Sequence, residues 1–106
     1  MENPETVEEL TIAREGDERM APRRELRKEV LATGSWVTVL YIYEELARKK
    51  AGDEWSKPKL ALVRYRKLKG AYKFQKEFSI SSLEQGEALR ETLNKWHEMG
   101  PPASDA

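Results

Sequence analysis

Positively charged side chains alternate with aromatic and aliphatic ones in the middle of this 106-residue chain. The cations gather at Lys57, Lys59, Arg64, Arg66, Lys67, Lys69 and Lys73. Aromatic residues lie nearby in sequence, at Trp36, Tyr41, Tyr43, Trp55 and Tyr65. Ammonium and guanidinium groups bind phosphate oxygens, and aromatic rings stack on nucleobases. The pattern therefore indicates a surface suited to single-stranded nucleic acid.

Candidates for each role come from this region. The candidate phosphate contacts are Lys59, Arg64, Arg66 and Lys73. The candidate stacking groups are Trp36, Tyr43 and Trp55. An ordinary solvated sheet face is the alternative interpretation, because outward lysine and arginine also protect edge strands from aggregation. Aromatic residues in strands commonly belong to a core rather than to a ligand platform.

Other kinds of chemistry find no support in the residue types. The chain has no cysteine and one histidine, His97, which cannot by itself build a usual zinc site. The six glycines are scattered and do not form a phosphate-binding loop. Beyond the N-terminal segment, the carboxylates are spread along a loop and a helix face. We therefore expect no enzyme activity, metal, cofactor or small-molecule substrate.

The formal net charge of zero conceals a division along the chain. Residues 1–20 hold seven acidic residues and two arginines, for a net charge of −5, whereas residues 21–98 hold 17 Lys and Arg against 11 Asp and Glu, for +6. An acidic segment beside a basic domain occurs in nucleic-acid binders, where it can compete with phosphates. It is also a common way to keep an ordinary domain soluble.

Four strands are predicted in the centre of the chain, at Leu26–Thr33, Trp36–Glu44, Lys59–Leu68 and Ala71–Ile80. The second strand is the clearest, since Trp36 to Tyr43 is a run of β-branched and aromatic residues with apolar side chains on both faces. Residues 45–57 form a charged connection. Lys69-Gly70 predicts a tight turn, and the last strand alternates so that Tyr72, Phe74, Phe78 and Ile80 point inward. Lys76 falls on this inward set and indicates a frayed or bulged position.

A helix is predicted to follow from Ser81, which has capping-box spacing with Glu84, and to end near Met99-Gly100. Its apolar stripe should lie on the sheet and comprises Leu83, Gly86, Leu89, Leu93 and Trp96. The predicted fold is α+β, with a four-stranded antiparallel sheet and one C-terminal helix packed on it. Residues 1–22 are expected to be an acidic disordered tail, 23–99 the ββββα domain and 100–106 a second disordered tail.

The ββββα layout resembles the single-strand-binding group that includes coactivators of the positive-cofactor-four type, PUR repeats and Whirly proteins. The resemblance covers roughly residues 25–97. It is closest from Pro58 to Tyr65 and from Lys73 to Ser81, followed by the helix. It implies homodimers formed by helix and sheet contacts, single-stranded DNA or RNA lying across curved sheets, and a role in transcription or DNA maintenance. The sequence departs from the pattern in its long connection 45–57 and its acidic N-terminal segment.

Two functional hypotheses follow. The first is a homodimer that binds single-stranded DNA or RNA through a basic and aromatic sheet face. The alternative is an assembly module that dimerises through strand 36–43 and the C-terminal helix without any nucleic-acid role. No apolar run reaches the roughly 18 residues of a membrane helix, and no signal-peptide stretch is evident, so we expect no membrane contact and a cytoplasmic location.

Overall fold

The computed structural model describes residues 4–102 and shows an antiparallel sheet of five strands with one helix after it. The strands are β1 (Arg23–Ala32), β2 (Trp36–Lys49), β3 (Gly52–Trp55), β4 (Lys59–Leu68) and β5 (Ala71–Ile80). The helix α1 spans Leu83–Met99, and a single 3-10 turn, η1, spans Val7–Glu9. The α+β class and the four predicted strands are confirmed.

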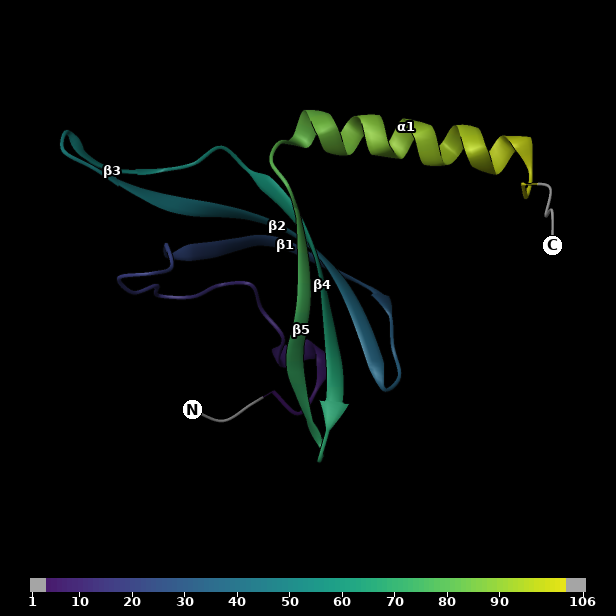
Figure 1. Ribbon diagram of the computed structural model, residues 1–106, viewed down its shortest axis with the longest axis horizontal. Helices are drawn as coiled ribbons and strands as arrows, with labels where there is room; N and C mark the ends of the chain where they lie inside the picture. The colour runs from purple at the N-terminus through teal and green to yellow at the C-terminus, as the bar shows by residue number, and fades with distance from the viewer. Residues whose placement is uncertain (1–3, 103–106) are drawn as a thin grey trace.

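The strands follow the order β1-β2-β4-β5, and β3 pairs only with the far end of β2. Four strands were predicted because residues 45–57 looked like a charged connection. Instead β2 continues to Lys49, turns, and returns as β3, with Leu46 paired to Trp55 and Lys49 paired to Gly52. This two-stranded arm extends from one end of the sheet, opposite in direction to α1 (Figure 1).

One face of the sheet, which we call the inner face, carries the core. Val37, Val39, Tyr41 and Tyr43 on β2 are almost completely buried there, next to Ala61 and Val63 on β4. A 2.9 Å hydrogen bond joins the Tyr41 and Tyr65 hydroxyls within this core. Burial raises the pKa of both hydroxyls, so they stay neutral at physiological pH.

The N-terminal segment covers this inner face, so the prediction of a disordered tail is wrong for residues 4–22. Leu10 and Ile12 are only 3% and 7% exposed and belong to the core. The Lys28 ammonium donates hydrogen bonds to three backbone carbonyls of the segment, at 2.6–3.2 Å. Arg14 and Arg23 form a β-bridge. We call residues 4–22 the strap.

The hairpin of β4 and β5 forms as predicted at its turn, but its residues alternate differently. Lys69 and Gly70 both have positive φ, 53° and 82°, as a two-residue hairpin turn requires. A register shift lies between Arg64 and Tyr65, whose partners on β5 are Lys76 and Phe74. The extra residue, Gln75, is a β-bulge and reverses the faces of the residues beyond it.

The bulge corrects the predicted inward set. Tyr72 and Phe74 lie on the inner face, whereas Phe78 and Ile80 lie on the opposite face, which we call the outer face. Tyr72 and Ile80 are buried, but Phe74 and Phe78 are 60% and 66% exposed. Of the two interpretations of Lys76, a frayed or a bulged position, the bulge is confirmed, and it lies one residue earlier, at Gln75.

The helix α1 begins on the outer face but leaves the sheet after its first turns. Ser82, not Ser81, is the N-cap, and its hydroxyl accepts a hydrogen bond from the Gln85 amide at 3.2 Å. A Cβ at Gly86 would collide with the Leu60 side chain, so glycine permits the close approach. Beyond this point the helix projects away, as Figure 1 shows, and Leu89, Leu93 and Trp96 are exposed. The prediction that the apolar stripe lies on the sheet of its own chain is therefore wrong.

The strands and the helix begin and end at the bounds predicted for the domain, 23 and 99. β1 begins at Arg23, three residues before the predicted strand and at the predicted domain boundary. The helix ends at Met99, and Gly100 follows with a φ of 80°, as predicted from the Gly-Pro sequence. Residues 103–106 of the predicted C-terminal tail lie outside the described part of the chain.

Candidate functional site

The outer face carries a group of cations at the end where β2 starts and the β4–β5 hairpin turns. Alternation along β4 puts Arg64 and Arg66 on this face, opposite Lys76 and Lys73 of β5. Trp36, the first residue of β2, is paired with Arg66 on the other side. The five side chains come from three neighbouring strands. We call them the basic patch: Trp36, Arg64, Arg66, Lys73 and Lys76.

The Trp36 ring organises two of these cations. The guanidinium carbons of Arg64 and Arg66 lie 4.5 Å and 5.3 Å from its centroid. A guanidinium over an indole at an exposed site is stabilised by about 0.5–1 kcal/mol, enough to bias its direction without fixing it. Trp36 remains 40% exposed, so its ring is accessible from solvent.

The charge of the basic patch is not neutralised by the carboxylates that the structure describes. All four cationic side chains are exposed, and none forms an ion pair with a carboxylate among residues 4–102. The acidic strap lies over the inner face, on the other side of the sheet, and so does not cover the patch. The four cationic groups can donate hydrogen bonds to phosphate oxygens, and the accessible indole beside them offers a surface on which a base can stack.

Two predicted site residues lie elsewhere. Tyr43 is buried on the inner face, where its hydroxyl donates to Ser79 at 3.3 Å. Lys59 is paired opposite Tyr43 and donates to Glu45 at 3.0 Å. The structure thus excludes both from an outward-facing site. Alternation along the strands separates both from the other candidates, because Tyr43 points away from the face of Trp36 and Lys59 points away from the face of Arg64 and Arg66.

Trp55, the third predicted stacking group, lies on the β3 arm and not beside Trp36. It is paired with Leu46 near the far end of β2, and Arg24 stands 4.2 Å from its ring centroid. Glu44 binds the same Arg24 at 2.7 Å. Trp55 is therefore half-buried in a local contact at the opposite end of the sheet.

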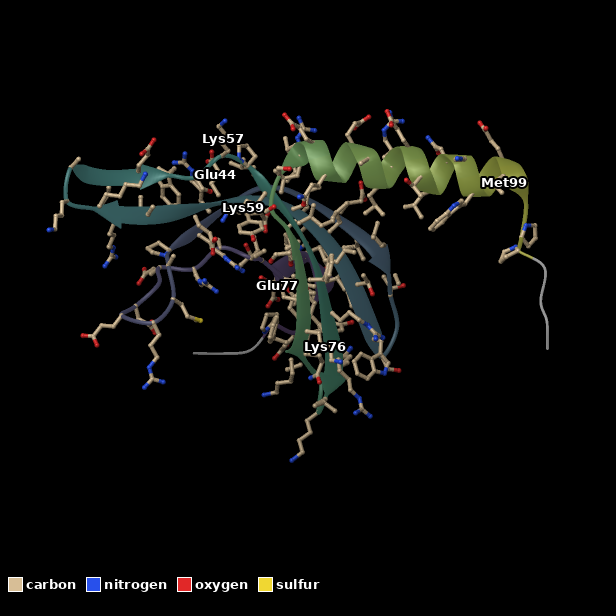
Figure 2. All side chains as sticks on the ribbon, turned by 45° about the horizontal axis from the view of Figure 1, so that its top comes forward. Glu44, Lys57, Lys59, Lys76, Glu77 and Met99 are labelled. Carbon is tan, nitrogen blue, oxygen red and sulfur yellow. The ribbon has the colours of Figure 1, made fainter. Side chains whose placement is uncertain are left out.

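Lys76 is a member of the basic patch that sequence reasoning missed. Its place in the alternating pattern made it an inward residue, and only the bulge at Gln75 brings it opposite Arg64. Figure 2 shows Lys76 near the hairpin end of the sheet, far from Lys57 and Lys59 at the end where α1 begins. The available signal was Lys76 itself, a charged residue at a position where the alternation of β5 predicts an apolar side chain.

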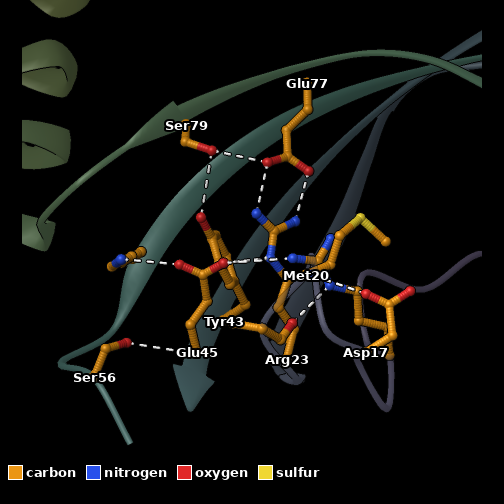
Figure 3. A network of polar contacts seen from close by, with 11 residues as sticks. Asp17, Met20, Arg23, Tyr43, Glu45, Ser56, Glu77 and Ser79 are labelled. Carbon is orange, nitrogen blue, oxygen red and sulfur yellow. Dashed lines mark hydrogen bonds and ion pairs between the residues drawn. The ribbon is translucent and has the colours of Figure 1, made fainter. Parts of the chain in front are cut away.

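A second charged group, on the inner face, is saturated by its own ion pairs. Arg23 is 10% exposed at its side chain and forms two hydrogen bonds with Glu77, of 2.7 and 2.9 Å, and one with Glu45, of 2.9 Å. Figure 3 shows these bonds together with those from Tyr43 to Ser79 and from Ser79 to Glu77. The guanidinium also lies 4.6 Å from the Tyr43 ring centroid. This network joins β1 to β2 and β5, and each of its charged groups already has an ionic partner.

The network makes the free energy of unfolding depend on pH in the acid range. Burial alone would raise the pKa of the Glu45 carboxyl, but hydrogen bonds from Arg23 and Lys59 bring it below its ordinary value. The hydrogen bonds from Arg23 also lower the pKa of Glu77. Since both folded-state values lie below the unfolded ones, this contribution is present above about pH 4.5 and is lost as pH falls through the folded values.

We therefore expect Glu77→Gln to lower the free energy of unfolding at pH 7 by about 1.5–3 kcal/mol and to flatten its decline between about pH 5 and pH 3. Urea unfolding at pH 7, 5, 4 and 3 measures both effects. Glu91→Gln on the solvent side of α1 is the control, and it should follow the wild type. Equal acid sensitivity of the wild type and Glu77→Gln would contradict the assignment.

Metal and membrane chemistry gain no support from the described residues. Residues 4–102 contain no group of three or more His, Asp or Glu side chains placed to hold a metal ion. None of the helices within that range has the length and hydropathy to cross a membrane. Comparison with protein-family models, with curated proteins and with solved structures found no match. The basic patch is therefore the candidate functional site of the described residues.

Proposed function

We propose that this protein binds single-stranded DNA or RNA through the basic patch and acts as a homodimer. One observation carries the proposal: Arg64 and Arg66 lie against the accessible ring of Trp36, Lys73 and Lys76 are paired with them on β5, and none of the four has a carboxylate partner among residues 4–102. Like charges this close repel one another, and a phosphate backbone relieves that repulsion. The ring favours a single strand, since only unpaired bases offer a face for stacking.

The apolar surface of the chain supports the homodimer. Leu89, Leu93 and Trp96 of α1 are exposed on one stripe, and Leu40, Ile42 and Leu62 lie on the outer face beside the basic patch. The radius of gyration is 16.7 Å, compared with about 13 Å for a compact domain of this size. A second copy that lays its helix along Leu40 and Ile42 of β2 would cover both apolar surfaces and leave the β5 side of the outer face, with Phe78, open.

The test is a fluorescence-anisotropy titration of a labelled single-stranded oligonucleotide at several salt concentrations. We expect binding in the micromolar range or tighter at low salt. If the four cations each contact a phosphate, log K should fall with log[salt] with a slope of about −3. A duplex of the same sequence should bind more weakly. Absence of binding at micromolar protein in low salt would overturn the proposal.

The exposed α1 stripe also favours the second candidate, an assembly module without a nucleic-acid role. Apolar association changes little with salt, whereas phosphate contacts weaken steeply. Light scattering that shows a dimer, combined with no oligonucleotide binding, would support this alternative. A dimer that also binds the oligonucleotide would support the first proposal.

A further inference from the structure

Phe78 extends the outer face beyond the basic patch. It is paired with Leu62, and Lys76, two residues earlier on the same face, is paired with Arg64. Its side chain is 66% exposed, although a phenyl ring in a strand is commonly buried. The core lies on the inner face, so packing within one chain does not account for this ring.

Phe78 and Trp36 lie on opposite sides of the row formed by Arg64 and Lys76. From the register, they are two strands apart across the sheet and four residues apart along β4. Strand spacing and rise place them roughly 16 Å from each other. Arg64 and Lys76 lie between the two rings, so a strand passing from one to the other meets aromatic, cationic and aromatic groups in succession.

We propose that Phe78 is a second base-stacking position of this site, so that one single strand lies diagonally over β2, β4 and β5 from Trp36 to Phe78. The inference rests on the proposed nucleic-acid function and adds the path of the ligand. Cations hold the phosphates between two stacked bases, an arrangement that serves any sequence because every base has a stacking face.

The test compares Phe78→Leu, Phe78→Trp and the wild type in the same anisotropy titration. Leucine keeps apolar volume but removes the ring, so affinity should fall by about 5- to 150-fold. Phe78→Trp keeps an aromatic ring, so its affinity should match that of the wild type. Phe74→Leu is the matched control, because Phe74 is 60% exposed on the same strand but lies on the inner face. Its affinity should stay within about twofold of the wild type.

Three outcomes overturn the inference without touching the proposed function. The first is wild-type affinity in Phe78→Leu, and the second is an equal loss in Phe74→Leu. The third is conversion of a dimer to a monomer by Phe78→Leu in light scattering, which would assign the ring to a subunit contact. Failure of the wild type itself to bind the oligonucleotide would instead sink the proposed function, and this inference with it.

Discussion

Replacing both arginines of the basic patch by glutamate is expected to weaken oligonucleotide binding by at least about 100-fold. In Arg64→Glu/Arg66→Glu, two phosphate contacts disappear and two negative charges face the backbone. A hydrogen bond to a charged group contributes about 1.5–3 kcal/mol, so loss of two contacts suffices for this factor. The residual binding should depend less on salt, because fewer counterions are released.

The fold should survive this exchange. Arg64 and Arg66 are exposed, and the interaction that they lose within the chain is the contact with the Trp36 ring. Lys50→Glu/Lys57→Glu is the matched control, since it changes the net charge by the same amount at the other end of the molecule, where Figure 2 places Lys57. Equal losses of affinity in both variants would show that net charge, rather than the basic patch, governs binding.

The second large effect is expected from the strap. Leu10→Ala/Ile12→Ala removes two core side chains that are 3% and 7% exposed. Each truncation of a buried leucine or isoleucine costs about 2–5 kcal/mol. Domains of this size have only about 5–15 kcal/mol of stability in total, so the double variant should be largely unfolded or close to its transition at 25 °C. Urea unfolding followed by circular dichroism measures the loss.

The control lies in the same segment. Glu8→Ala/Glu15→Ala changes exposed acidic residues of the strap and should alter the free energy of unfolding by no more than about 0.5 kcal/mol per site. If Leu10→Ala/Ile12→Ala were as stable as this control, the strap would not belong to the core. Since removing the whole segment would also remove core, charge neutralisation is the cleaner way to ask whether its acidic groups influence binding.

Strand pairing explains which site residues could be predicted. Arg64, Arg66 and Lys73 were placed together correctly, because alternation within β4 and a two-residue turn at Lys69-Gly70 bring β5 back at known register. Trp36 joined them because a run of β-branched and aromatic residues identifies β2. Tyr43 and Lys59 were wrong, because both lie on the inner face, where Tyr43 is buried in the core and Lys59 is paired with Glu45.

Local sequence patterns are enough to predict four of the five strands, the β4–β5 turn, the helix that ends just before Gly100, and the spacing of cations along β4. These follow from side-chain alternation, turn chemistry and helix termination, which act over a few residues. The faces of the residues beyond the bulge and the position of the strap depend on contacts between segments that are distant in the sequence. The bulge at Gln75 moved Lys76 and Phe78 to the outer face, since a ladder register depends on two strands. Leu10 and Ile12 hold the acidic segment on the inner face. The free energy gained by burying their apolar surface exceeds the entropic cost of ordering a segment whose composition predicts disorder.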